Sequence, residues 1–213
     1  MSEGTLYVVA TPIGNLEDIS RRALRVLGEV EALACEDTRR SRIIYEKNAI
    51  HRPRTIFSCH EHNEAQASRR ILGLLADGVS VALVTNAGYP AVSDPGYRVV
   101  SAVVDAGHRV EVIPGPSAVM QALVVSGLPS SSFTFLGFPP RKPGPLGRLL
   151  QEHRDQPHTL LFYESPHRLR RLLEAVADNL GDRRAAVCIE LTKMFEQVRR
   201  GSVSYTHLRA HET

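Results

Sequence analysis

The sequence is poor in several features that identify large classes of protein. It has no tryptophan and only three cysteines, and Cys35, Cys59 and Cys188 lie far apart, without a Cys-x-x-Cys pair or a Cys/His ligand spacing. This spacing argues against a disulfide framework and a zinc site, and we expect three buried thiols. The longest apolar runs are a handful of residues, such as 81–84, whereas a membrane-spanning helix needs ~20.

A secretory signal is also missing from the N-terminus. Glu3 stands where such a signal would be basic, and the apolar stretch 6–10 is too short for its hydrophobic region. The sequence therefore predicts a cytoplasmic protein that does not cross a membrane.

Lysine is scarce as well. Of the 26 cationic residues only Lys47, Lys142 and Lys193 are lysine, and the other 23 are arginine. The formal net charge of +3 and the pI near 8.9 permit an anionic partner without demonstrating one. Arginine suits phosphate contacts because its planar guanidinium binds in a bidentate manner, but codon bias in a GC-rich genome explains the same composition.

Runs rich in β-branched residues alternate with helical patterns along the whole chain, which is typical of βα units on a largely parallel sheet. Strands are expected at 6–10, 30–35, 55–59, 79–85, 109–113, 132–136, 158–163 and 185–191. Helices are expected from about residue 18, at 37–47, 61–77, 97–106 and 117–126, and around the leucines between 169 and 180. The proline-rich segment 139–145 is predicted to be an exposed loop.

The pattern changes register at Pro114, so we place a domain boundary there. Residues 1–113 then form an N-terminal α/β domain, and residues 114–202 form a C-terminal α/β domain that is one or two elements short of a complete fold. Residues 203–213 look like the translation of a transposon-type sequencing adapter. We therefore expect this tail to be poorly packed and the strand at 185–191 to have an unprotected edge.

Four turns that follow expected strands combine glycine, proline and small polar residues, as ligand sites of open α/β sheets do. They are 12–16, 86–90, 93–96 and 114–118. Neither a Gly-x-Gly-x-x-Gly fingerprint nor a Walker A sequence is present, which weighs against nicotinamide-dependent oxidoreductases and kinases. Ser93 lacks the preceding glycine that a nucleophile elbow requires, so a hydrolase triad is not expected.

Six segments resemble, in order and spacing, one bacterial enzyme family. They are 11–20 (TPIGNLEDIS), 35–39 (CEDTR), 86–96 (NAGYPAVSDPG), 114–118 (PGPSA), 162–168 (FYESPHR) and 190–193 (ELTK). The resemblance is to the ribosomal RNA small subunit methyltransferase I family of the tetrapyrrole methylase (class III methyltransferase) superfamily. It implies S-adenosylmethionine-dependent 2′-O-methylation of a cytidine ribose in 16S ribosomal RNA. It also implies a homodimer, with the cofactor in a cleft between two α/β domains.

The resemblance assigns ten residues to the cofactor site. They are Pro12, Gly14, Asn86, Ala87, Gly88, Pro116, Ser117, Ala118, Tyr163 and Glu190. Because S-adenosylmethionine has no phosphate, glycine-containing turns without a phosphate-binding fingerprint suit it. The chain departs from the family at Asn86, where the family has aspartate, and at Ile189, where it has arginine.

The sequence leaves the proton acceptor and the RNA contacts open. Candidate bases are Glu36, Asp37 and Glu164, although the first two lie where a helix begins and also suit capping. The segment 60–62 (HEH) resembles a metal cluster but suits an exposed helix cap better, so no metal is predicted. The candidates for contacts to RNA phosphates are Arg39, Arg141, Lys142 and Arg168.

Two other functions remain open. One is carbon methylation of a tetrapyrrole within the same superfamily. Segments 35–39 and 162–168 match the ribosomal RNA enzymes more closely than the tetrapyrrole enzymes. The other is a non-catalytic RNA-binding or ribosome-binding protein, suggested by Asn86 and by the missing end of the second domain.

Overall fold

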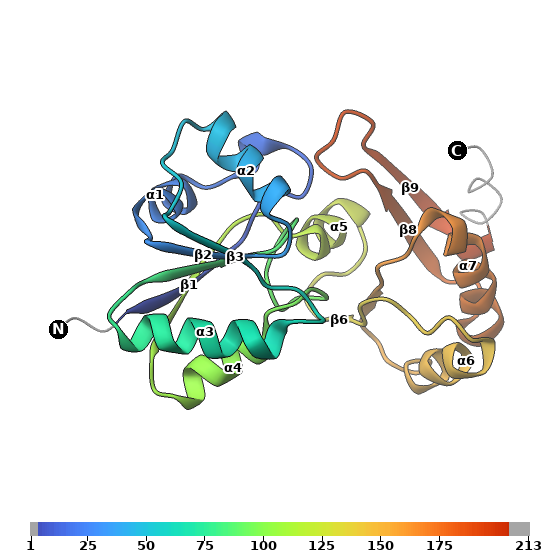
Figure 1. Cartoon of the computed structure of the whole chain (residues 1–213). Coiled ribbons are helices and arrows are strands. Elements are labelled where there is room, and N and C mark those ends of the chain that lie inside the picture. Colours follow the sequence, from blue (N-terminus) through green and yellow to red (C-terminus); the bar gives the residue numbers. More distant parts are fainter. Residues whose placement is uncertain (1–3, 205–213) are drawn as a thin grey trace. The chain divides into compact units, whose positions relative to one another are not determined.

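The computed structural model describes residues 4–204. The chain divides into two compact units, one ending at Ser117 and the other beginning at Ala118. Helices and strands alternate through most of the chain, so the α/β class predicted from the sequence is confirmed (Figure 1).

The first unit contains a five-stranded sheet in which every pairing is parallel. The spatial order is β3-β2-β4-β1-β5. The strands are β1 Thr5–Val9, β2 Ala32–Cys35, β3 Thr55–Ser58, β4 Val81–Val84 and β5 Arg109–Ile113. Because the strands are parallel, the loops that follow them all leave from one edge of the sheet.

Helices cover both faces of this sheet. Helices α3 (Glu64–Ala76) and α4 (Tyr97–Asp105) pack on one face, and α1 (Arg21–Glu29) and α2 (Thr38–Lys47) pack on the other (Figure 1). Strand β4 shows the alternation that this requires. Its first and third side chains join the core under α3 and α4, and its second and fourth join the core under α1 and α2. A strand buried on both faces is apolar throughout, as the sequence predicted.

Short polar side chains set where the first two of these helices begin. The Ser20 hydroxyl accepts a hydrogen bond from the N–H of Ala23 at 3.1 Å, so α1 begins at Arg21. The segment Leu16–Asp18, where the sequence predicted the start of this helix, forms a 3₁₀ turn instead. Asp37 caps α2 in the same way as Ser20 caps α1.

The second unit contains two small sheets. Strands β6 (Phe133–Phe135) and β7 (Thr159–Leu161) are parallel, and β8 (Arg184–Ile189) and β9 (Gln197–Ser202) are antiparallel. Helices α6 (Pro143–Glu152) and α7 (Pro166–Leu180) pack together through buried leucines at 146, 150 and 172. Helix α5 (Ala118–Ser126) lies against β8 and β9, where Arg200 donates to the carbonyl of Val125 at 3.0 Å.

The prediction of an exposed loop at 139–145 is wrong at both ends. Pro139 is buried, and α6 begins at Pro143. Proline is compatible with the first turn of a helix because the N–H groups there have no partner inside the helix. The exposed non-helical part of the segment is therefore short and contains Arg141 and Lys142.

The predicted poorly packed tail is wrong for Val203 and Ser204, and the predicted unprotected edge is wrong for the side of β8 that pairs with β9, a strand that the sequence did not predict. Strand β9 pairs with the whole of β8, from Arg184 opposite Ser202 to Ile189 opposite Gln197. Val203 is 1% exposed and donates its N–H to the carbonyl of Arg183 at 3.0 Å. The Ser204 N–H and hydroxyl both donate to the carboxylate of Asp182 at 2.9 Å. Residues 205–213 of the predicted tail lie outside the described residues.

Two further expectations concern the cysteines and the membrane. Cys35 and Cys59 are buried thiols, as predicted, and Cys188 is half-buried. Within residues 4–204, no helix is long and apolar enough to pass through a bilayer.

Candidate active site

The loops that follow β1 and β4 are joined at the carboxyl edge of the five-stranded sheet. The N–H of Thr11 donates to the carbonyl of Gly88, and the N–H of Gly88 donates to the carbonyl of Thr11, both at 2.9 Å. The Thr11 hydroxyl donates to the carbonyl of Thr85 at 3.0 Å and is fully buried. Two of the turns singled out in the sequence therefore form one rigid structure.

The loop that follows β5 meets the other two at Gly88. A methyl group placed on the α-carbon of Gly88 would lie 3.6 Å from Cγ2 of Ile13 and 4.0 Å from the carbonyl oxygen of Pro116. The φ of Gly88 is +75°, a value that favours glycine. The hydroxyl oxygen of Tyr89 accepts a hydrogen bond from the N–H of Gly115 at 3.1 Å. This bond is a second link between the loop after β4 and the loop after β5.

The residues that the resemblance assigned to the cofactor are divided between the units. Those on the loops of the first unit, which the structure brings to one edge of the sheet, are Pro12, Gly14, Asn86, Ala87, Gly88, Pro116 and Ser117. Gly14 and Ala87 are exposed there, whereas Pro12 and Gly88 are buried. The remaining three belong to the second unit, where Ala118 begins α5, Tyr163 follows β7 and Glu190 follows β8.

Polar groups at this edge of the sheet suit a ligand without phosphate. The N–H of Asn86 donates to Oε2 of Glu36 at 3.0 Å, so the loops after β4 and β2 are also linked. The hydroxyl of Thr85 is buried and has no hydrogen-bond partner within the described part of the chain. A buried hydroxyl without a partner is costly, which favours a ligand atom as its partner.

Among the candidate bases, Asp37 makes the contacts of a helix cap. Its Oδ1 accepts from the N–H of Arg39 at 2.8 Å, and its Oδ2 pairs with the Arg39 guanidinium at 3.1 Å. These hydrogen bonds lower the pKa of Asp37, which makes the carboxylate a poor proton acceptor. The side chain of Arg39, a candidate for RNA contact, is 90% exposed and pairs with this carboxylate.

Asp94 is a carboxylate that the sequence analysis did not single out, although the turn 93–96 was recognised. Burial, and then the charge of Glu36, raise the pKa of Asp94 to about 6. A carboxylate with this pKa is able to exchange a proton near neutral pH. No sequence pattern signals this property, because it depends on residues that only the fold brings near Asp94.

The loop that carries Asp94 is held in an unusual backbone conformation. Ala91 and Ser93 have φ values of 70° and 60°, which few residues other than glycine adopt. The buried carboxylate of Glu64 fixes the end of the loop, since its Oε1 accepts from the N–H groups of Gly96 and Arg98, both at 2.9 Å. Fixed strained loops of this kind cluster at functional sites.

The third candidate base, Glu164, lies in the second unit and is engaged by a cation. Its side chain is 6% exposed and pairs with Arg168 at 2.9 Å, and its Oε1 accepts from the N–H of Ser165 at 2.7 Å. Arg168 also donates to the carbonyl of Pro139 at 2.9 Å, so this guanidinium fixes the loop after β6. Arg141 and Lys142 on that loop are exposed.

The histidines at 60 and 62 lie in a turn before α3, which begins at Glu64 rather than at the expected residue 61. The N–H of His60 donates to Oδ1 of Asn63 at 2.8 Å, and the two imidazole rings lie 6.0 Å apart. Residues 4–204 contain no group of three or more His, Cys, Asp or Glu side chains arranged to hold a metal ion.

Residues 5–205 match the family of Tetrapyrrole (Corrin/Porphyrin) Methylases. The chain belongs to the tetrapyrrole methylase family. Within it, the ribosomal RNA small subunit methyltransferase I of Mesorhizobium japonicum is 49% identical over 202 residues, which are 94% of this chain and 68% of the relative. The enzyme of the same name from Bacillus subtilis is 42% identical over 201 residues, again 94% and 68%. The chain therefore also belongs to this narrower group, as the six segments predicted.

Solved structures confirm the class III methyltransferase fold of this tetrapyrrole methylase. Cobalt precorrin-4 methyltransferase superimposes with a TM-score of 0.71 at 17% identity, covering 98% of this chain and 89% of that one. Uroporphyrin-III-C-methyltransferase from Thermus thermophilus superimposes with a TM-score of 0.65 at 23% identity, covering 94% and 86%. At these identities the likeness concerns the fold alone.

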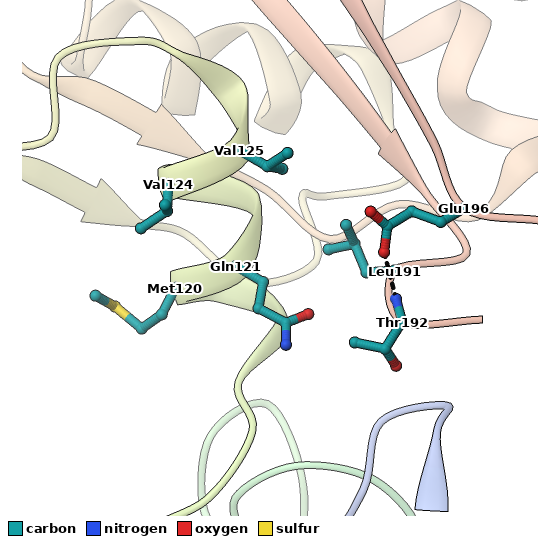
Figure 2. A pocket seen from close by; sticks show the side chains of 7 residues that line it. All are labelled: Met120, Gln121, Val124, Val125, Leu191, Thr192 and Glu196. Carbon is teal, nitrogen blue, oxygen red and sulfur yellow. Dashed lines mark hydrogen bonds between the residues drawn. The ribbon is translucent and has the colours of Figure 1, made fainter. Parts of the chain in front are cut away.

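The second unit of the methylase also contains a pocket of about 430 Å³ beside α5 (Figure 2). It is lined by Met120, Gln121, Val124, Val125, Leu191, Thr192 and Glu196. The carboxylate of Glu196 accepts a hydrogen bond from the N–H of Thr192 at 2.6 Å, which closes the loop between β8 and β9 (Figure 2). None of the residues assigned to the cofactor from the sequence is among these seven.

Proposed function

We propose that this protein transfers the methyl group of S-adenosylmethionine to the 2′-oxygen of a cytidine ribose in 16S ribosomal RNA of the small ribosomal subunit. The observation that carries the proposal is the 42–49% identity, over nearly the whole chain, to enzymes named ribosomal RNA small subunit methyltransferase I. The resemblance also supports a homodimer acting in the cytoplasm.

The loops at the carboxyl edge of the first unit suit S-adenosylmethionine. The bound cofactor supplies a methyl group on a positively charged sulfur. Its amino acid part and ribose need hydrogen-bonding groups rather than a phosphate cradle. The Thr85 hydroxyl has no partner among the described residues, and Gly14 and Ala87, on the loops that Thr11 and Gly88 link, are exposed. Asn86 provides a neutral acceptor where the family has a charged one, so we expect weaker binding at that position.

The chain's own residues serve alignment and proton transfer. Methyl transfer is an in-line displacement, and holding the ribose oxygen in line supplies much of the acceleration. The hydrogen bonds from Thr11 to Gly88 and from Gly115 to Tyr89 hold the three loops together, which favours such alignment. The ribose hydroxyl must also lose its proton, and Asp94, with a pKa of about 6, accepts one more readily than the capped Asp37.

Carbon methylation of a tetrapyrrole is less well supported. The two tetrapyrrole methyltransferases compared above are 23% and 17% identical to this chain, whereas the ribosomal RNA enzyme of Mesorhizobium japonicum is 49% identical. A non-catalytic RNA-binding role was suggested by Asn86, but asparagine keeps a hydrogen-bond acceptor at this position.

The experiment offers the purified full chain three acceptors, each with labelled S-adenosylmethionine. The acceptors are small ribosomal subunits that lack ribose methylation, protein-free 16S RNA and uroporphyrinogen. We expect label in the subunits. Label in uroporphyrinogen alone supports the tetrapyrrole alternative, and binding of subunits without any transfer supports the non-catalytic one.

A further inference from the structure

An exposed phenylalanine stands at the carboxyl edge of the small parallel sheet in the second unit. Phe138 follows β6, and its side chain is 62% exposed. Tyr163 follows β7, and its N–H donates to the carbonyl of Gly137 at 2.8 Å. The two aromatic residues are therefore placed side by side at the edge where parallel sheets bind ligands.

The rings form a continuous aromatic surface. The Tyr163 ring lies edge-on to the ring of Phe135, with centroids 4.8 Å apart and planes at 70°. The Phe138 ring lies 5.4 Å from the Tyr163 ring between centroids, with planes at 53°. Phe135 and Tyr163 are half-buried. They support Phe138, and the side chain of Phe138 remains largely exposed to solvent.

The backbone beside Phe138 is fixed. The next residue, Pro139, is buried and accepts a hydrogen bond from Arg168, which the nearly buried Glu164 holds by an ion pair at 2.9 Å. Placing a large apolar side chain in water in this fixed position gains nothing for folding. The arrangement suits a surface that is covered when a partner binds.

Two cations identify the kind of partner. Arg141 and Lys142 follow on the same loop and are exposed, and among the described residues neither side chain forms an ion pair. Aromatic rings beside basic side chains are the usual surface for single-stranded nucleic acid, because the rings stack on bases and the cations contact phosphates.

We propose that Phe138, supported by Tyr163, stacks on a nucleobase of the RNA substrate while Arg141 and Lys142 contact the adjoining phosphates. This inference rests on the proposed function and adds the place where an unpaired base is held. The adenine of S-adenosylmethionine is also a nucleobase, and the resemblance assigned Tyr163 to the cofactor. The cofactor has no phosphate for the two cations, so RNA is the partner that these residues favour.

The test uses a short single-stranded RNA carrying the fluorescent base pyrrolocytosine, whose emission falls when it stacks. Phe138→Ala in the full chain should abolish the fall in emission and weaken binding about ten-fold, the size expected for one lost base stack. Phe138→Trp keeps a stacking ring and should behave as wild type. Phe133→Ala is the matched control, because Phe133 begins the same strand at its other end and is 38% exposed.

Separate measurements distinguish a nucleobase of RNA from the adenine of S-adenosylmethionine as the group that stacks on Phe138. The inference requires the affinity of Phe138→Ala for S-adenosylmethionine, measured by calorimetry, to stay within two-fold of wild type. Loss of cofactor binding with unchanged RNA binding overturns it in favour of adenine. Equal fall in emission for wild type and Phe138→Ala, or no RNA binding by wild type, also overturns it. Methyl transfer by the wild type to small subunits tests the proposed function separately. If Phe138→Ala leaves this transfer unchanged, only the inference about base stacking is overturned.

Discussion

Thr11 and Gly88 exchange two backbone hydrogen bonds of 2.9 Å between loops that are far apart in the sequence. Both residues are buried, and each follows a strand of the same parallel sheet. The pair therefore fixes the position of the turn 86–90 relative to the turn 12–16, before any ligand binds. The cofactor site proposed here depends on this fixed pair of turns.

Replacing Gly88 tests that dependence. In Gly88→Val a branched side chain would project toward Ile13 and Pro116, where the three loops meet, and we expect affinity for S-adenosylmethionine to fall at least ten-fold. Calorimetric titration of the purified variant measures this.

Gly107 offers the matched control for the Gly88 variant. Its φ of +78° is close to that of Gly88, but a β-carbon added there would meet no atom within 4 Å. Gly107→Val should carry the same backbone strain and bind the cofactor within two-fold of wild type. Equal affinities for the two variants would place the cofactor away from Gly88.

Replacing Asp94 tests its raised pKa. In the folded protein Asp94 has a pKa of about 6, above the ordinary value of 3.8. Between pH 3.8 and about pH 6 the folded chain holds a proton on Asp94 that the unfolded chain has lost. The contribution of Asp94 to the free energy of unfolding is therefore largest below pH 4 and is lost as the pH rises through 6.

Asp94→Asn should accordingly be more stable than wild type at pH 8 and gain little near about pH 3.5, below both pKa values. Because the side chain is half-exposed, we expect about 1 kcal/mol rather than the full value of the shift. Urea unfolding at the two pH values measures the difference, and Asp155→Asn, at an exposed position, is the control. The same stability difference at both pH values would contradict the raised pKa.

Val203 tests whether the residues after β9 belong to the fold. Removing two methyl groups from this buried side chain in Val203→Ala should lower the free energy of unfolding by about 2 kcal/mol. The same substitution at Val124, which is 75% exposed, should change it by less than about 0.5 kcal/mol. Urea unfolding of both variants measures these free energies. If Val203→Ala unfolds with the same free energy as wild type, Val203 is unpacked, as the sequence predicted for the tail.

The basic pair after β6 is expected to contact phosphates. Changing Arg141 and Lys142 to alanine should weaken RNA binding for all sequences and flatten its salt dependence by about one or two phosphate contacts. The control changes Arg52 and Arg54, two exposed arginines at the amino end of β3 in the first unit. It removes the same charge and should leave the slope unchanged. An unaltered slope in the first variant would make the pair ordinary solvated surface.

The five-stranded sheet was predictable because local pattern and tertiary environment agree in it. Strand β4 is apolar throughout since helices cover both of its faces. Strand β9 was missed because its sequence, QVRRGS, contains two arginines and a glycine. It becomes a strand through its pairing with β8, which no local pattern reveals. Helix α6 was missed because the prolines of its first turn resemble a loop.

The candidate site was predictable at the level of loops but not of side chains. Turns after parallel strands must share an edge, so the sequence places Thr11 and Gly88 at the same edge, whereas their direct contact depends on the pairing of β1 with β4. The pKa of Asp94 depends on burial and on Glu36, and the contact of Phe138 with Tyr163 depends on how two strands pair. These properties come from tertiary structure alone.

The position of the transferred methyl group tests the central claim most directly. Small ribosomal subunits lacking ribose methylation are incubated with the full chain and S-adenosylmethionine that carries a deuterated methyl group. The RNA is then digested to nucleosides for mass spectrometry. We predict the deuterated methyl group on 2′-O-methylcytidine and on no other nucleoside. Label on a nucleobase, or no label in the RNA while uroporphyrinogen accepts it, would contradict the account.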